Sequence, residues 1–371
     1  MGNVHTPFRY DYVGSFLRPE KLKQARAGFE AGAITTWQLK EVEDRCITEL
    51  VAKQKAAGYH VITDGEFRRS TWHLDFMWGF GGIGHSATEN GLPFHGEAAK
   101  IDDTYLTDKL SVGVHPFVEH FKFVKALEDE NTVAKQTIPA PAQFLEQLVM
   151  PMNLPDTRKF YPTDEELIAD LVACYKKVIA DLYAAGCRNL QFDDCTWGCF
   201  VDPKATMFFG ADEEGLEKLQ EEFLLVNNLA MEGKPEDLVI NTHICRGNFH
   251  STWACSGGYD KIADQVFARE QVNALYLEFD DARSGGFQCL SKVSPDKKVV
   301  LGLVTTKSPR LEDKDAVIAR IHEAAKYIPL DRLCLSPQCG FASCEIGNKL
   351  TEEEQWAKLA LVKEIAEQVW G

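Results

Sequence analysis

A histidine and a cysteine two positions apart, His243 and Cys245, lie at the end of an apolar run in residues 241–248. On a β-strand, residues two apart project from the same face, so this imidazole and this thiolate could bind one metal ion together. Zinc is the metal that mixed nitrogen and sulfur ligation favours. The competing interpretation is a buried cysteine beside a hydrogen-bonded histidine, and only ligands from elsewhere in the chain would favour a metal site.

Further candidate ligands lie where other apolar runs end. Eight short runs alternate with long helical patterns, at residues 10–15, 60–63, 132–138, 189–193, 238–245, 274–279, 299–304 and 332–336. Eight strands alternating with helices are typical of an α/β fold, the (β/α)₈ TIM barrel, whose active site lies at the carboxyl ends of the strands. The polar residues expected there include Ser15, Arg18, Glu66, Arg68, Asp193, His243, Cys245, Glu278, Asp280, Lys307 and Cys339.

Helix boundaries support this alternation. Capping boxes are predicted at Thr35 with Gln38, at Thr163 with Glu166 and at Thr351 with Glu354. The first two helices are expected to stop at Gly58 and Gly186, because glycine adopts the left-handed cap most easily. The last helix carries apolar residues at helical spacing and should pack on the outside of the barrel.

The stretch between Glu66 and His115 is rich in glycine and aromatic residues and shows no clear period. We interpret it as an elaborated loop after the second strand. A phosphate-binding loop is the alternative, but the stretch lacks the Lys-Ser/Thr ending that such loops require. No repeat or linker marks a boundary, so a single domain is expected over residues 1–371.

Composition limits the possible partners. The chain has 371 residues and a formal charge of −16, which repels nucleic acid and anionic membrane surfaces. Residues 1–7 lack a signal-peptide pattern, and no apolar run approaches the roughly 18 residues of a membrane span. Eleven cysteines without framework spacing indicate reduced thiols or metal ligands. We expect a cytoplasmic protein, with homo-oligomer formation left open.

The motifs and their order resemble the cobalamin-independent methionine synthase family, in its single-barrel branch. The family's strand-five HxC pair matches His243 and Cys245, its strand-six carboxylate matches Glu278, and its Cys-Gly after strand eight matches Cys339 with Gly340. Residues 63–70 and 277–285 match the single-barrel branch more closely than the full-length synthases. The resemblance implies a catalytic zinc ion bound by His243, Cys245, Glu278 and Cys339.

The resemblance also implies a substrate site. The segment 191–194 looks like the family segment in which an aspartate receives the substrate amino group, which would be Asp193, and Gly14-Ser15 looks like the turn that contacts homocysteine. Two departures affect the prediction. Full-length members have a second, N-terminal barrel that helps to bind folate, for which 371 residues leave no room, so the methyl donor is open between methylfolate and another compound. An alignment on Arg283-Ser284 would make Asp280 the ligand instead of Glu278.

Other residues near the strand ends have two interpretations. Arg18 and Arg68 could clamp a substrate carboxylate, with Glu66 beside them, or each arginine could form a salt bridge in this acidic chain. Trp72 and His73 could line the pocket, with His73 either a general acid or a packed loop histidine. Four other cysteines, Cys195, Cys199, Cys334 and Cys344, are interpreted as buried small apolar residues and not as a second metal site.

The predicted chemistry is methyl transfer to a thiol. A free alkyl thiol has a pKa near ~8.5, so only a small fraction is the nucleophilic thiolate at neutral pH. Two cysteinates and a carboxylate on zinc would keep a bound substrate sulfur electron-rich. The expected acceptor is homocysteine, giving methionine. The alternatives are alkyl transfer to another small thiol, as in coenzyme-M transferases, a metal-free barrel like that of uroporphyrinogen decarboxylase, and a zinc- or thiol-binding module without turnover.

Overall fold

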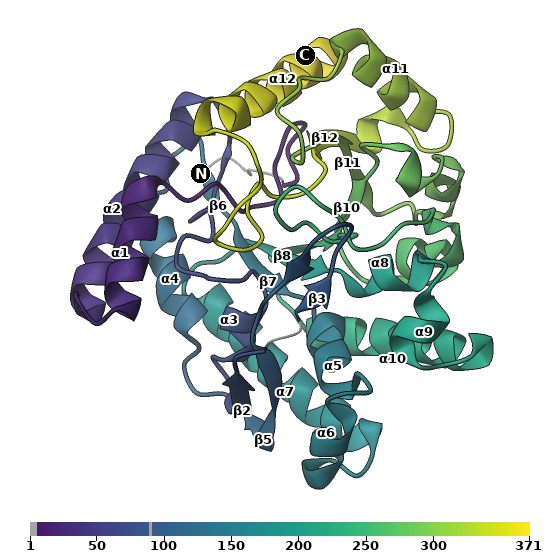
Figure 1. Ribbon diagram of the computed structural model, residues 1–371. Helices are drawn as coiled ribbons and strands as arrows, with labels where there is room; N and C mark the ends of the chain where they lie inside the picture. The colour runs from purple at the N-terminus through teal and green to yellow at the C-terminus, as the bar shows by residue number, and fades with distance from the viewer. Residues whose placement is uncertain (1–5, 89–90) are drawn as a thin grey trace.

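The structure is a computed structural model that describes residues 6–88 and 91–371. Residues 1–5, which belong to the stretch that lacks a signal-peptide pattern, lie outside the described residues. Six parallel strands form one sheet in the order β12-β11-β10-β9-β8-β7 (Figure 1). They are β7 (Gln136–Pro139), β8 (Asn189–Asp194), β9 (Val239–Ile244), β10 (Ala274–Glu278), β11 (Lys298–Val304) and β12 (Leu333–Pro337). Nearly every residue of these strands is buried, as expected for a parallel sheet covered on both faces.

Two short segments extend this arrangement. β1 (Val61–Ile62) pairs in parallel with β6 (Val133–Ala134), and the amide of Lys135, which lies between β6 and β7, donates to Ile62 O at 2.9 Å. At the other end of the sheet, Tyr10 forms a parallel bridge with Leu335 of β12. The chain is therefore an α/β fold in which segments from the two ends of the sequence lie side by side.

The predicted first strand, residues 10–15, is wrong beyond Tyr10. The carbonyl groups of Tyr12, Val13 and Gly14 accept hydrogen bonds from side chains instead of pairing with a neighbouring strand. Val13 O accepts from Gln191 Nε2 at 2.8 Å, and Gly14 O accepts from Thr63 Oγ1 at 2.9 Å. These long-range side-chain donors satisfy the backbone without a ladder, and local sequence does not reveal them.

Long helices connect most of the strands and cover the sheet from outside. The helices are α1 (Glu20–Glu30), α2 (Thr36–Ala56), α4 (Pro116–Lys125), α5 (Pro141–Val149), α6 (Leu154–Phe160), α7 (Asp164–Ala184), α8 (Thr196–Val201), α9 (Ala205–Phe209), α10 (Glu213–Met231), α11 (Lys314–Ala324) and α12 (Glu352–Trp370). Shorter helical turns are Tyr259–Lys261, Ala263–Phe267, Ala282–Ser284, Gln288–Lys292 and Leu330–Arg332. None of the helices within the described ranges combines the length and apolar character that a membrane crossing requires.

The predicted helix caps agree closely with the structure. Both hydrogen bonds of the capping box are present at the starts of α2 and α12, whereas Thr163 at the start of α7 accepts from the amide of Glu166 without a reciprocal bond in the described residues. Gly58 and Gly186 follow α2 and α7 with φ values of +83° and +98°. These boundaries are local, which explains why sequence predicts them.

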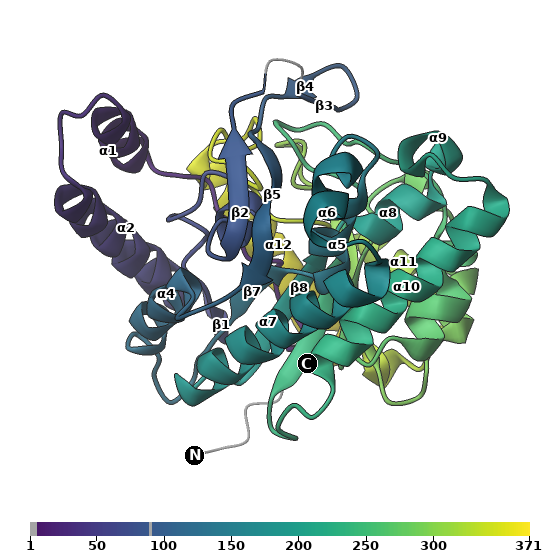
Figure 2. The same ribbon diagram turned by 90° about the horizontal axis from the view of Figure 1, so that it is seen from below.

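The insertion after β1 contains structure of its own. It comprises α3 (Leu74–Met77), the antiparallel pair β2 (Gly81–Ser86) and β5 (Asp103–Ser111), and a smaller antiparallel pair, β3 (Leu92–Pro93) and β4 (Ala98–Ala99). Figure 2 shows β3 and β4 at one end of the molecule, beyond β5. Within this hairpin, the amide of His95 donates to Trp253 O at 2.8 Å, and the two rings stack at 4.5 Å. The hairpin is thereby joined to the loop after β9.

Candidate metal centre

The ends of three strands of one sheet, β9, β10 and β12, bring four candidate ligands together. His243 lies in β9 with Cys245 just beyond it, Glu278 is the last residue of β10, and Cys339 follows β12 by two residues. All four are buried, and their nitrogen, sulfur and oxygen ligand atoms lie within 4.8 Å of one another. The cysteines and carboxylate are in contact, because Cys245 Sγ is 3.6 Å from both Cys339 Sγ and Glu278 Oε1. The spacing of two positions between His243 and Cys245 therefore does place them on one face.

The ligand atoms fit a zinc ion chemically. Both ring nitrogens of His243 are buried and have no hydrogen-bond partner among the described residues. A buried polar atom without a partner is costly, and a bound metal ion would satisfy one of the two nitrogens. Glu278 Oε2 accepts from the amide of Arg246 at 3.0 Å, which orients its carboxylate toward the two sulfurs. One nitrogen, two sulfurs and one carboxylate oxygen are a ligand set that zinc accepts.

The two candidate carboxylates after β10 have different surroundings. Glu278 belongs to the cluster, whereas Asp280 lies beside Arg283, at 3.8 Å, and close to Lys307. Lys307 Nζ is buried without a hydrogen-bond partner in the described part of the chain. Burial lowers the pKa of Lys307, but the nearby charges of Glu278 and Asp280 outweigh it, so the pKa is raised. Lys307 therefore stays cationic and offsets part of the negative charge of the cluster.

A pocket of about 580 Å³ opens onto the cluster through His243, Cys245 and Cys339. A volume of this size is typical of small-molecule sites. Three of the predicted substrate residues also line the pocket, namely Ser15, Glu66 and Asp193. The chain thus brings Ser15, Glu66, which follows β1, and Asp193 of β8 to the face where the candidate ligands lie.

Glu66 and Asp193 form an acidic corner of the pocket. Glu66 Oε1 accepts from Thr137 Oγ1 at 3.0 Å and lies 3.3 Å from Arg69 NH1, while Asp193 Oδ1 accepts from Gln191 Nε2 at 2.7 Å. Burial, and then the nearby carboxylate of Glu66, raise the pKa of Asp193 well above its usual range. A cationic group that enters this corner would restore the ionised form of Asp193, because an opposite charge favours a carboxylate.

Ser15 lies against the segment that carries Cys339. Its Oγ accepts from the amide of Ala342 at 3.3 Å, and a Cβ atom added at Gly340 would lie 1.9 Å from that Oγ. Only glycine fits next to Ser15, which explains the Cys-Gly pair in the sequence.

Arg18 and Arg68 do not line the pocket. The guanidinium of Arg18 donates to four backbone carbonyls, those of Phe16, Glu66, Arg69 and Ala342. Arg68 donates to the carboxylates of Glu43 and Asp44. The salt-bridge interpretation thus describes Arg68. Arg18 instead links loops through their backbone carbonyls. Neither arginine is retained in the proposed substrate site.

The insertion supplies an aromatic wall that the sequence indicated only as a Gly- and aromatic-rich stretch. Phe94 and His95 line the pocket together with Trp253 and Phe249, and the rings of Phe94 and Phe249 lie 5.3 Å apart. Trp72 and His73 line it as well. Burial lowers the pKa of His73 to about 4, so the ring is neutral near pH 7, which favours the packed-histidine interpretation over a general acid.

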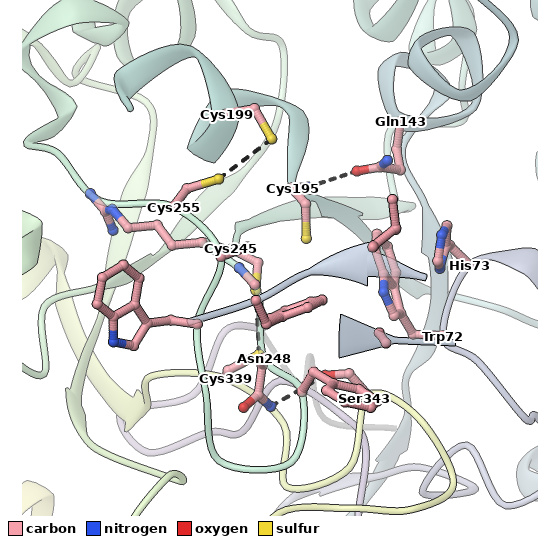
Figure 3. A pocket seen from close by; sticks show the side chains of 18 of the residues that line it. Trp72, His73, Gln143, Cys195, Cys199, Cys245, Asn248, Cys255, Cys339 and Ser343 are labelled. Carbon is pink, nitrogen blue, oxygen red and sulfur yellow. Dashed lines mark hydrogen bonds between the residues drawn. The ribbon is translucent and has the colours of Figure 1, made fainter. Parts of the chain in front are cut away.

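Cysteines that we interpreted as small apolar residues also belong to the pocket wall. Cys195, Cys199 and Cys344 line it, as does Cys255, whereas Cys334 is fully buried in β12. Figure 3 shows Cys195, Cys199 and Cys255 on the same side of the pocket as Cys245. Because these cysteines are spread over positions 195 to 255, no local sequence pattern predicts that they line one pocket.

Comparison with known proteins is consistent with this site. The family described as "Cobalamin-independent synthase, Catalytic domain" matches residues 158–368. The uncharacterized Bacillus subtilis (strain 168) proteins YxjG and YxjH are 43% and 44% identical over 98% of this chain and 95% of their own.

Two solved structures cover nearly all of the chain. One, from Listeria monocytogenes and assigned provisionally to the vitamin-B12-independent methionine synthases, is 36% identical over 98% of both chains, with a TM-score of 0.78. A B12-independent methionine synthase from Shewanella sp. W3-18-1, in complex with selenomethionine, shares the fold at 17% identity, with a TM-score of 0.71 over 97% of both chains. The family match covers more than half of the chain and includes the segments that carry all four candidate ligands, so this chain belongs to the cobalamin-independent methionine synthase family.

Proposed function

We propose that this chain is a zinc-dependent methyltransferase that transfers a methyl group to the thiol of homocysteine, giving methionine. The observation that carries the proposal is the buried cluster of His243, Cys245, Glu278 and Cys339, open to a pocket with an acidic corner. We further propose that residues 1–371 form a single domain and that the parallel segments close into a (β/α)₈ barrel through the bridge between Tyr10 and Leu335.

The cluster would act on the sulfur of the acceptor. A zinc ion bound there supplies a Lewis acid that lowers the pKa of a ligating thiol. Cys245 and Cys339 contribute negative charge that keeps the acceptor sulfur nucleophilic. Glu278 is the ligand that we expect to yield to the acceptor, because a carboxylate oxygen is harder than a cysteine sulfur and is displaced more easily.

The acidic corner would orient the acceptor. Asp193 and Glu66 lie where they can receive an ammonium group, and Ser15 can donate a hydrogen bond from its hydroxyl. An amino acid whose ammonium is held at Asp193 would direct its side-chain thiol toward the cluster across the same pocket. This arrangement favours an amino-acid thiol over a sulfonate-bearing one, since a sulfonate brings no cation to the two acids.

The methyl donor would enter along the aromatic wall. A methylated folate is the donor that the family implies, and the flat rings of Trp72, Trp253 and His95 offer stacking surfaces for a heterocycle. In the reaction the bond between methyl carbon and donor breaks as the bond to sulfur forms.

The eleven free cysteines favour a location in a reducing compartment such as the cytoplasm.

Two measurements test the proposal. Metal analysis of the purified chain should give one zinc per chain. Calorimetry with homocysteine, in buffers of different ionisation enthalpy, should show release of about one proton near neutral pH, because a thiol with a pKa near ~8.5 enters and a thiolate is held. A chain without stoichiometric zinc, or a proton count near zero, would contradict the proposal. The methyl donor is tested separately, by a mass-spectrometric screen that identifies or excludes methylfolate.

A further inference from the structure

Two cysteines outside the proposed metal centre face each other in the pocket wall. Cys199 lies on α8 and Cys255 lies on the loop after β9, with their Sγ atoms 3.7 Å apart (Figure 3). Both line the pocket and both are partly exposed. Because 56 residues separate them, only the fold brings them together.

The backbone around this pair is held in place on both sides. The amide of Cys255 donates to Arg246 O at 2.9 Å, and the amide of Ser256 donates to Asp202 Oδ2 at 2.8 Å. On the other side, a Cβ atom added at Gly198 would lie 2.1 Å from Cys245 O, so α8 packs directly on the residue that carries a candidate ligand. A disulfide bond is about 2.05 Å long, so the two sulfurs need approach by only about 1.7 Å.

We propose that Cys199 and Cys255 are a redox-active thiol pair that reduces small disulfides entering the pocket, in particular the disulfide of an amino-acid thiol. The identity of that thiol rests on the proposed function, whereas the pair itself does not. The thiolate of Cys255 attacks one sulfur of the disulfide, whose S–S bond breaks and releases one small thiol. Cys199 then attacks the mixed disulfide at Cys255 Sγ and releases the second. Two protons pass from the pair to the two leaving thiolates, and the pair is oxidised by two electrons.

The order of attack follows from the surroundings of the two sulfurs. The hydrogen bond shared with Cys255 and burial raise the pKa of Cys199 well above its usual value, which favours Cys255 as the sulfur that attacks first. Cys245 and Cys339 are equally close, at 3.6 Å, but they are candidate metal ligands. In the zinc-loaded protein, the pair at the wall therefore reacts first and spares the metal centre.

The test uses the zinc-loaded full chain, incubated separately with homocystine, cystine and oxidised glutathione. Free-thiol counting should show loss of two of the eleven thiols with homocystine or cystine, reversed by dithiothreitol. Peptide mapping should find a Cys199–Cys255 cross-link, with the zinc content unchanged. Absence of this cross-link, a Cys245–Cys339 cross-link formed first with loss of zinc, or reaction with oxidised glutathione alone would each overturn the proposal.

Two variants sharpen the result. Cys199→Ser removes the resolving thiol and should trap a lasting mixed disulfide on Cys255, while Cys344→Ser, a change at another pocket cysteine, should form the same cross-link as the unmodified chain. A mixed disulfide that is released as readily in Cys199→Ser as in the unmodified chain would count against the pair. Methyl transfer is measured separately. A mapped cross-link without methyl transfer would reject the proposed function alone. Methyl transfer without the cross-link would reject the redox role of Cys199 and Cys255 alone.

Discussion

The parallel β-structure of the chain has two halves that are held together in different ways. In the regular half, β8 to β12, each strand has five to seven residues and pairs with the next along most of its length, with one register shift between β11 and β12 at Gly302 to Val304. In the irregular half, which comprises residues 10–15 with β1, β6 and β7, ladders are short, and β1 and β6 have two residues each. Side chains replace ladder hydrogen bonds there, as at Gln54, whose amide group bonds to both backbone groups of Thr63.

This difference matches the positions of the functional residues. The candidate metal ligands come from the regular half, where the register fixes the direction of every second side chain. His243 pairs in register with Tyr276, two residues before Glu278, so the imidazole and the carboxylate face the same side. Ser15 ends the first segment of the irregular half and Glu66 follows its strand β1, and both line the pocket. Ladders thus set the directions of His243 and Glu278, whereas side-chain contacts hold the segments that carry Ser15 and Glu66.

The largest effect should follow a change in the metal ligands of the regular half. Cys339→Ser should lose most of the zinc and all measurable turnover, because a soft sulfur ligand is replaced by a hydroxyl. Glu278→Gln should keep most of the zinc yet turn over slowly. Zinc content and methionine formation, measured on both variants, check this contrast. Equal zinc loss in the two variants would show that the carboxylate is as essential to metal binding as the thiolate.

A buried ion pair of the irregular half should give the largest effect on stability. Lys135 Nζ is fully buried, lies 2.9 Å from Asp11 Oδ1 and also donates to Tyr12 O. Lys135→Met leaves a buried carboxylate unpaired and should lower the free energy of unfolding by about 3–5 kcal/mol, as measured by denaturant titration.

Controls for this change come from both halves. Adding Asp11→Asn should restore part of the stability, because it removes the unpaired charge. Lys297→Met, directly before β11 in the regular half, removes a buried lysine that donates to Phe267 O and Ser294 Oγ, and it should cost less. Equal losses at Lys135 and Lys297 would contradict the claim that side chains hold the irregular half.

A smaller effect is expected at the substrate corner between the halves. Asp193→Asn should weaken homocysteine binding about 10- to 100-fold, the equivalent of ~1.5–3 kcal/mol for a hydrogen bond to a charged group. Asp194→Asn is the matched control. Asp194 is the next residue in the chain, but its carboxylate accepts a hydrogen bond from Asn227 Nδ2 and does not line the pocket. Calorimetry on both variants decides the point, and unchanged affinity in Asp193→Asn would remove the amino-group assignment.

The smallest effect concerns pH. Glu146 lies on α5, after β7. Burial raises its pKa to about 8, because this effect exceeds the lowering of the pKa by the hydrogen bond that Thr196 donates. The folded chain therefore keeps a proton that the unfolded chain releases above about pH 4.3, so stability is lost as pH rises toward 8. Glu146→Gln cannot ionise, and its stability relative to the unmodified chain should rise by up to ~1.4 kcal/mol between pH 6 and pH 7, the one-unit interval that is compared. The surface change Glu236→Gln should show no such trend in the same urea titrations.

What the sequence alone determined was local. The spacing of His243 and Cys245, the apolar runs of β8 to β12 and the caps of α2 and α12 each depend on a few neighbouring residues, so their patterns are legible in one sequence. Family resemblance added Glu278 and Cys339 to the predicted ligands, and the structure places both beside Cys245.

What only the tertiary structure decided was the choice among distant partners. Arg18 and Arg68 had many acids and carbonyls within reach of a flexible side chain, and packing assigned them to loop carbonyls and to Glu43 and Asp44. The loss of the first strand depends on donors from Thr63 and Gln191, and the meeting of Cys199 with Cys255 depends on α8 packing against the loop after β9. Such contacts are set by the whole fold, because no short segment contains both partners.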